Sequence, residues 1–134
     1  MSLLEACAGV AIISGVVFFA APSLIRARKN YQLDVVSRQV AAKTQWTRIK
    51  AISRNCDCRI RVTSGASYVI ECEDSAWRLD ETVTLPKGFR IDANASPRFH
   101  KRGNASPAGT ITISDTHHKS RRVIVNITGR VRVE

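Results

Sequence analysis

Three cysteines lie close together in the middle of the sequence, and their spacing suggests chemistry. Cys56, Cys58 and Cys72 fall within seventeen residues, whereas the fourth cysteine, Cys7, stands near the N-terminus. Three thiols are one ligand short of a closed zinc site, which takes four. They suit one disulfide and one remaining thiol, and a disulfide indicates an oxidising compartment.

The sequence Gly129-Arg130-Val131-Arg132 has the residue types for phosphate binding. On a strand, Arg130 and Arg132 share one face. Their guanidinium groups, about 7 Å apart, then approximate the spacing of successive phosphates on one DNA strand. Further basic residues that we include in this candidate DNA-binding set are Lys119, Arg121, Arg122, Lys101 and Arg102. The competing interpretation is an edge strand that charge protects from aggregation.

Asp115, His117 and His118 raise the question of a metal site. Adjacent histidines on a strand point to opposite faces, and the segment has the pattern of a hairpin turn. We therefore interpret it as a solvated loop and predict no metal and no cofactor. No nucleophile-elbow sequence, phosphate-binding loop or other catalytic spacing occurs. An enzyme tethered to a membrane is thus the remote alternative.

Charge is concentrated behind the first segment of the chain. The 134 residues include 21 Lys and Arg against 11 Asp and Glu, which gives a net charge of +10, and every Lys and Arg follows residue 25. A domain this basic attracts polyanions such as nucleic acid, anionic lipid or acidic protein. The length allows one membrane span and one domain of about 100 residues.

The N-terminal segment predicts a membrane anchor. Residues 6–25 carry no charge, and about 20 apolar residues suffice for a helix to cross a hydrocarbon core. Glu5 lies at the edge of this segment, where a carboxylate needs a cationic partner. A signal peptide would have a basic start and a cleavage site of small residues, and neither is present. Basic residues after the span favour the cytoplasm, whereas the cysteines favour an oxidising compartment, so we expect a specialised insertion route.

The expected fold class is α+β, a long kinked N-terminal helix packed on an antiparallel β-sheet domain with two small sheets. The helix is predicted to reach about Arg54 and to kink at Pro22. Residues at three- and four-residue steps predict a buried face made of Leu33, Val36, Val40, Thr47 and Ala51, with Ile52 beside them. The packing is expected to be thin at Thr44 and Thr47. We divide the chain into a membrane-spanning or filament-core segment 1–25, an amphipathic continuation 26–55 and a β-domain 56–134.

From residue 56 the hydrophobic period becomes two, which predicts strands. Residues 58–62 and 68–72 read as a hairpin whose cysteines share one face, so Cys72 is expected to pair with either Cys56 or Cys58. Arg59 and Arg61 are expected to face Glu71 and Glu73 across this hairpin. Further strands are predicted at residues 82–85, 89–92, 98–101, 109–114, 120–128 and 130–134.

Several of these stretches resemble a known family. Leu3-Leu4-Glu5, the apolar run and Pro22 resemble the N-terminal region of type IV pilins and type II secretion pseudopilins. The segment Thr47–Asn55 resembles the helix end of H-type minor pseudopilins and FimT minor pilins, with its pattern small-Arg-x-x-Ala-Ile-x-x-Asn. The segments 98–103, 109–113 and 122–133 resemble their β-domain. In that family a leader ending in Gly is removed; Met1 here occupies the place usually held by Phe.

The resemblance implies a non-enzymatic subunit of a type II secretion pseudopilus or a type IV pilus. Such a subunit crosses the bacterial inner membrane once, keeps its β-domain in the periplasm and then assembles with other pilins or pseudopilins. The implied assembly residues are Met1, Glu5 and Pro22, with Met1 processed and methylated by the prepilin peptidase and Glu5 paired with a neighbour's N-terminal amine. FimT-type pilins bind DNA through Gly-Arg-x-Arg, whereas H-type pseudopilins carry a similar sequence without that role. DNA uptake is therefore the alternative function.

Overall fold

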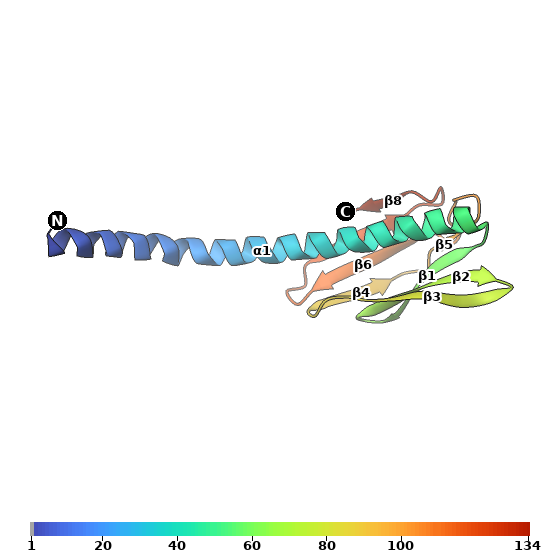
Figure 1. Cartoon of the computed structure of the whole chain (residues 1–134), viewed down its shortest axis with the longest axis horizontal. Helices are drawn as coiled ribbons and strands as arrows, with labels where there is room; N and C mark the ends of the chain where they lie inside the picture. The colour runs from blue at the N-terminus through green and yellow to red at the C-terminus, as the bar shows by residue number, and fades with distance from the viewer. Residues whose placement is uncertain (1) are drawn as a thin grey trace. The chain divides into compact units, whose positions relative to one another are not determined.

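The computed structural model describes residues 2–134, so Met1, the residue expected to be processed and methylated, lies outside the described residues. The chain forms two compact units, Met1–Gln32 and Leu33–Glu134. Within residues 2–134, one helix is followed by eight strands: α1 (Leu3–Arg54), β1 (Cys58–Ser64), β2 (Ser67–Asp74), β3 (Ala76–Thr84), β4 (Phe89–Ala93), β5 (Arg98–Phe99), β6 (Gly109–Asp115), β7 (Ser120–Val125) and β8 (Val131–Val133). Figure 1 shows these elements.

The helical part of the first unit, residues 3–32, has apolar side chains that are not buried. Pro22 lies inside α1, and the helix continues through it. The exposed large apolar residues of this segment are Leu3, Leu4, Val10, Ile12, Ile13, Val16, Val17, Phe18, Phe19, Leu24 and Ile25. Within the described residues, α1 is the one helix long and apolar enough to cross a membrane.

The second unit packs the C-terminal half of α1 along two antiparallel sheets (Figure 1). Sheet A has the strand order β3-β2-β1-β5, and sheet B has the order β4-β6-β7-β8. The backbone also joins the two sheets, since the N–H of Ile91 donates to the carbonyl oxygen of Gly65 at 2.9 Å. This arrangement confirms the predicted fold class of one long helix on two small antiparallel sheets.

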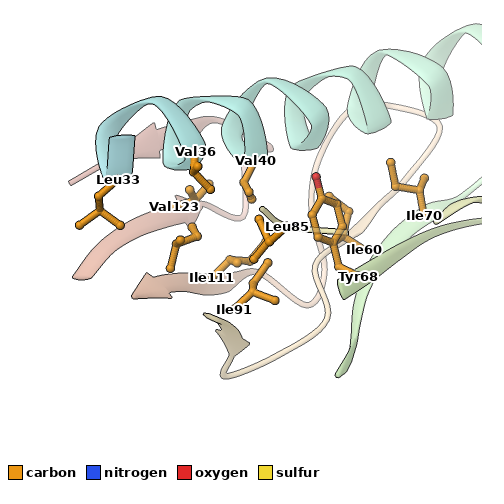
Figure 2. Close-up of a cluster of buried hydrophobic side chains, with 11 residues drawn as sticks. Leu33, Val36, Val40, Ile60, Tyr68, Ile70, Leu85, Ile91, Ile111 and Val123 are labelled. Atoms are coloured by element: carbon orange, nitrogen blue, oxygen red, sulfur yellow. The ribbon is translucent and has the colours of Figure 1, made fainter. Parts of the chain in front are cut away.

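The main hydrophobic core lies between the helix and both sheets (Figure 2). The helix contributes Leu33, Val36 and Val40, which confirms that part of the predicted buried face. Sheet A contributes Ile60, Tyr68 and Ile70, and sheet B contributes Ile91, Ile111, Ile113 and Val123. A second cluster at the end of the helix contains Ala51, Cys58, Cys72, Phe99, Ala105 and Val125. The part of α1 that begins at Leu33 is therefore held to the sheets by apolar burial.

The expectation of thin packing at Thr44 and Thr47 is wrong. Both residues are fully buried. The hydroxyl of Thr44 donates to the carbonyl oxygen of Val40 at 2.8 Å, and the hydroxyl of Thr47 donates to the carbonyl oxygen of Lys43 at the same distance. Because each hydroxyl is satisfied one turn back on the same helix, the rest of the side chain packs as a β-branched apolar group would.

Strand β3 is longer than predicted. The sequence pattern indicated only residues 82–85, whereas the strand spans Ala76–Thr84. Glu71 lies opposite Leu79 and Ile70 lies opposite Glu81, so Asp80 is an extra residue that forms a β-bulge. A bulge interrupts the alternation of side chains between the two faces of a strand. The alternation of apolar and polar residues therefore did not predict the part of β3 before Thr82. Strands β7 and β8 are shorter than predicted, because the chain turns at Gly129 between them.

Candidate functional site

Two glycines bring two loops of the second unit against helix α1. Gly103 and Gly129 have φ angles of +88° and +80°, which L side chains rarely adopt. The guanidinium of Arg48 donates from Nε to the carbonyl oxygen of Gly103 at 2.8 Å. A Cβ on Gly129 would lie 1.8 Å from that same oxygen. Packing therefore requires glycine at position 129, the first residue of the Gly129-Arg130-Val131-Arg132 segment.

This contact joins two of the sequence stretches that carry the family resemblance. Arg48 belongs to the helix-end pattern, and Gly129 begins the basic C-terminal segment. The N–H of Ala105 also donates to the carbonyl oxygen of Ile127 at 2.9 Å, which holds the same two loops together. The sequence did not indicate these partners, because 55 residues separate Arg48 from Gly103.

The seven candidate DNA-binding residues do not share one face. Arg122 and Arg132 both pair with Glu134, the former at 3.4 Å. Arg121 points to the opposite side of β7 from Arg122, because side chains alternate along a strand. Arg130 is exposed just before β8, Lys101 and Arg102 lie in the loop that precedes Gly103, and Lys119 lies beside the β6–β7 turn. Glu134 therefore neutralises part of the positive charge that the sequence places here.

Asp115 organises the turn that joins β6 to β7. Its Oδ1 accepts hydrogen bonds from the backbone N–H groups of His117 at 2.8 Å and Lys119 at 3.0 Å. His118 has a φ of +61°, within the left-handed region. The predicted turn at these residues is confirmed, and the Asp115 carboxylate stabilises it by accepting hydrogen bonds from backbone N–H groups.

The outer face of sheet A carries a network of arginines and carboxylates. Glu71 accepts from Arg59 at 2.6 Å and from Arg61 at 2.8 Å, so it pairs with both arginines of the predicted cross-strand set. The hydrogen bonds from Arg61 and then Arg59 outweigh burial and hold the pKa of Glu71 below its usual value. Glu73 instead pairs with Arg98 at 3.0 Å.

Asp57 connects the start of β1 to β5. It accepts from Arg98 Nη2 at 2.6 Å and lies 2.9 Å from Nδ1 of His100. Burial alone would raise the pKa of Asp57, but the hydrogen bonds from Arg98 and His100 hold that pKa below its usual value. Trp77 covers this network, with the guanidinium carbons of Arg59 and Arg98 lying 4.1 and 5.0 Å from its ring centroid.

We expect the Glu71→Gln variant to lose stability at neutral pH but not at acid pH. A carboxyl whose folded-state pKa is depressed stabilises the fold above its unfolded pKa of about 4, and that stability is lost as the pH falls through the folded value. At pH 7 the variant should be less stable by about 1 kcal/mol, and the difference should disappear near pH 2. Urea unfolding of the full chain in detergent, followed by tryptophan fluorescence, measures both. Glu134→Gln is the exposed control, and a pH-independent difference for Glu71→Gln would contradict the assignment.

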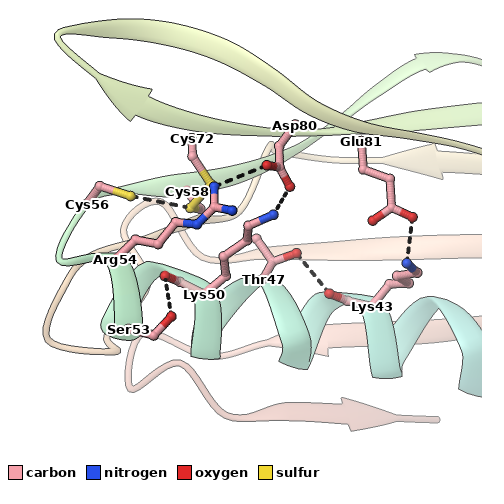
Figure 3. Close-up of polar contacts among 10 residues, drawn as sticks. All are labelled: Lys43, Thr47, Lys50, Ser53, Arg54, Cys56, Cys58, Cys72, Asp80 and Glu81. Carbon is pink, nitrogen blue, oxygen red and sulfur yellow. Dashed lines mark hydrogen bonds and ion pairs between the residues drawn. A yellow bond between two sulfur atoms is a disulfide. The ribbon is translucent and has the colours of Figure 1, made fainter.

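The bulge at Asp80 creates a charged connection between sheet A and helix α1 (Figure 3). Asp80 pairs with Lys50 and, at 3.2 Å, with Arg54, while the next residue, Glu81, pairs with Lys43 at 2.6 Å. Lys50 is mostly buried, and burial, followed by the charge of Arg54, lowers its pKa. A buried ammonium needs such a partner. The bulge places two successive carboxylates, those of Asp80 and Glu81, against the helix.

The three cysteines of the central cluster lie together where α1 ends and β1 begins. Cys58 and Cys72 are directly opposite on β1 and β2 and form a disulfide. Cys56 remains a thiol, and its Sγ lies 3.9 Å from that of Cys58 (Figure 3). The disulfide joins the hairpin on its buried face, within the second apolar cluster.

Glu5 has a local role that the sequence interpretation missed. The Ser2 hydroxyl accepts from the backbone N–H of Glu5 at 3.3 Å, and the Glu5 carboxylate accepts from the N–H of Ser2 at 3.5 Å. This reciprocal pair is a capping box, which supplies acceptors for N–H groups at the helix start. Its signature, Ser-x-x-Glu, is present in the sequence as Ser2-Leu3-Leu4-Glu5 and was sufficient to indicate it.

A long helix with an unburied apolar start, followed by two four-stranded antiparallel sheets, defines the class of pilin-like minor pseudopilins and minor pilins. Residues 36–129 match the family described as type II transport protein GspH, and the chain belongs to this family. Both findings confirm the predicted resemblance. The family and the fold are those of structural filament subunits rather than of enzymes.

Solved structures of such subunits have the same fold. The minor pseudopilin EpsH from the type 2 secretion system of Vibrio cholerae aligns with a TM-score of 0.66 and 14% identity over 77% of this chain and 96% of that chain. The type IV minor pilin FimU of Pseudomonas aeruginosa aligns with a TM-score of 0.65 and 16% identity over 79% of this chain and 90% of that chain. No protein in the search of curated sequences matches this one.

Proposed function

We propose that this chain is a non-enzymatic minor subunit of a periplasmic filament, most simply the pseudopilus of a type II secretion system. One observation supports this proposal. The chain belongs to the GspH family, and the apolar side chains of its first unit, on α1 between Leu3 and Ile25, are not buried. Apolar side chains of this length and number require lipid or protein around them. The inner membrane provides the first environment and the filament core provides the second.

The two units are proposed to have different roles. Residues 1–25 anchor the chain in the inner membrane and later pack among the same segments of neighbouring pilins or pseudopilins. The folded second unit, with residues 33–54 and the periplasmic β-domain 56–134, then forms the outer part of the filament. The prepilin peptidase is the expected processing partner, acting at Met1, and Pro22 supplies a point where the apolar helix lacks one backbone hydrogen bond.

Glu5 is proposed to select the neighbouring subunit during assembly. Its carboxylate would be buried in a filament core, where an opposite charge must neutralise it, and the N-terminal amine of a neighbour supplies that charge. The capping box gives Glu5 a second role that does not need a neighbour. The two roles are separable, because glutamine fills the capping position as well as glutamate does.

We expect the Glu5→Gln variant to remain in the membrane and to be lost from filaments. The variant keeps the capping geometry and removes only the charge. The measurement is the amount of this subunit in filaments sheared from cells that express the sibling subunits, relative to the amount in the membrane; we expect a decrease of tenfold or more. Ser2→Ala, which removes the cap and keeps the charge, is the matched control and should assemble like the wild type. Normal incorporation of Glu5→Gln would refute the pairing.

DNA binding by a minor pilin stays a prediction of the basic C-terminal segment. Arg130 and Arg132 are exposed, as phosphate binding requires. However, Glu134 pairs with Arg132 and Arg122, and Gly129 is explained by its contact with Gly103. The Gly-Arg-x-Arg sequence therefore does not by itself distinguish a DNA-uptake pilin from a secretion pseudopilin.

A further inference from the structure

The sulfur atoms of Cys56, Cys58 and Cys72 form a compact group outside the surfaces used above for assembly. All three Sγ atoms lie within 4.8 Å of one another. The disulfide occupies two of them, and the third is a thiol whose nearest sulfur, that of Cys58, is 3.9 Å away. A thiolate at that distance needs only a small side-chain rotation to reach the disulfide.

Accessibility differs sharply among the three sulfurs. Cys58 is 0% exposed and Cys72 is 6% exposed, so both sulfurs of the disulfide are largely shielded from thiols in solvent. Cys56 is half-buried and lines two surface pockets, one with Asp57 and His100 and the other with Arg54 and Cys72. Cys56 is thus the most exposed member of the group, and its thiol lies beside the disulfide.

The backbone keeps Cys56 in this position. Its N–H donates to the carbonyl oxygen of Ala51 at 3.1 Å, which closes the end of α1. On the other side, the N–H of Glu73 donates to the carbonyl oxygen of Asp57 at 2.8 Å, which extends the β1–β2 ladder to the residue next to Cys56. The thiol is therefore held beside the disulfide by fixed main chain on both sides.

We propose that this three-sulfur group is a thiol–disulfide exchange site, with Cys56 as the attacking thiol and thiol compounds as its ligands. The Cys56 thiolate attacks Sγ of Cys58, a Cys56–Cys58 bond forms, the Cys58–Cys72 bond breaks, and Cys72 leaves as a thiolate that takes up the proton released by Cys56. No external oxidant or reductant is consumed, because one disulfide replaces another. The exchange moves the disulfide from the buried face to an accessible sulfur.

The second step requires an external dithiol. One of its thiolates attacks Sγ of Cys56, forms a mixed disulfide and releases Cys58 as a thiolate. The other thiol of the reagent then attacks the mixed disulfide, releases Cys56 and leaves the reagent as a cyclic disulfide. The protein gains two thiols, and the dithiol is oxidised in the same stoichiometry.

The first test maps the disulfides without any reductant. Full-length protein in detergent is incubated at pH 8, quenched in acid and denaturant with excess N-ethylmaleimide, and digested for mass spectrometry. We expect a fraction of molecules with a Cys56–Cys58 disulfide and maleimide on Cys72, and none of this labelling in Cys56→Ser. Labelling of Cys56 and Cys7 alone in the wild type, at all times, would overturn the proposal.

The second test measures how fast dithiothreitol reduces the disulfide of the folded protein. We expect Cys56→Ser to slow this reduction by tenfold or more, because dithiothreitol must then attack the shielded sulfurs of Cys58 and Cys72 directly or wait for the protein to unfold. Cys7→Ser, which removes the other free thiol, is the control and should react at the wild-type rate. Equal rates for the wild type and Cys56→Ser, with equal stability towards urea, would overturn the role of Cys56.

Discussion

Replacing Gly129 by alanine is expected to lower the free energy of unfolding of the second unit by about 4 kcal/mol. A left-handed conformation costs a non-glycine residue about 1–2 kcal/mol, and forcing extra atoms into a packed site costs about 1–3 kcal/mol. Here the added Cβ would meet the backbone oxygen of Gly103, which cannot move without breaking its hydrogen bond to Arg48. Urea unfolding of the full chain in detergent, followed by the fluorescence of Trp46 and Trp77, measures the loss.

Gly65→Ala is the matched control for this prediction. A Cβ at Gly65 would have only the flexible side chain of Arg90 as a neighbour, at 3.7 Å or more, and Gly65 does not have a positive φ. We expect its stability to stay within about 0.5 kcal/mol of the wild type. If Gly129→Ala were as stable as this control, the Gly129–Gly103 contact would not be a determinant of the fold.

Removing the Cys58–Cys72 disulfide is expected to have the second-largest effect. The two residues are 14 apart in sequence, and a loop of this length restricts the unfolded chain enough to stabilise the fold by about 3 kcal/mol. The Cys58→Ala, Cys72→Ala double variant removes the bond without introducing buried hydroxyl groups. The same urea experiment, at equal detergent concentration, gives the difference in unfolding free energy.

Cys56→Ser serves as the control for the double variant. Its side chain is partly exposed and forms no covalent bond in the native state, so we expect a change below about 0.5 kcal/mol. The unfolding experiment and the reduction experiment measure different quantities. Cys58 and Cys72 are expected to determine the free energy of unfolding, whereas Cys56 is expected to determine only the rate of disulfide exchange. A double variant as stable as Cys56→Ser would show that hairpin packing alone holds β1 to β2.

The fold was largely predictable from local periodicity, and the failures have identifiable physical causes. The helix face at Leu33, Val36 and Val40 followed from three- and four-residue spacing. Strand β3 was mostly missed because the bulge at Asp80 shifts the alternation of faces. The packing at Thr44 was underestimated because a buried hydroxyl satisfied within its own helix cannot be distinguished from an exposed one by residue type.

The candidate site was less predictable than the fold, because its contacts join residues far apart in the chain. Arg48 belongs to a pattern that was noticed, but nothing in the sequence indicates that its partner is the carbonyl oxygen of Gly103. The charge of the C-terminal strand was evident, whereas its partial neutralisation by Glu134 depends on the register of β7 and β8. The capping box at Ser2, by contrast, is predictable from the local spacing of Ser2 and Glu5 alone.

The polar contacts of α1 with the sheets also have a mechanical consequence within the second unit. They are spaced along the helix, with Lys43 on Glu81, Arg48 on Gly103 and Lys50 on Asp80. At 1.5 Å rise per residue, these three positions cover about 10 Å of the helix axis. A pull along that axis loads all three contacts and the apolar core simultaneously in shear, whereas a pull across it would break them one after another. The domain is thus built to resist tension in the direction in which its own helix runs.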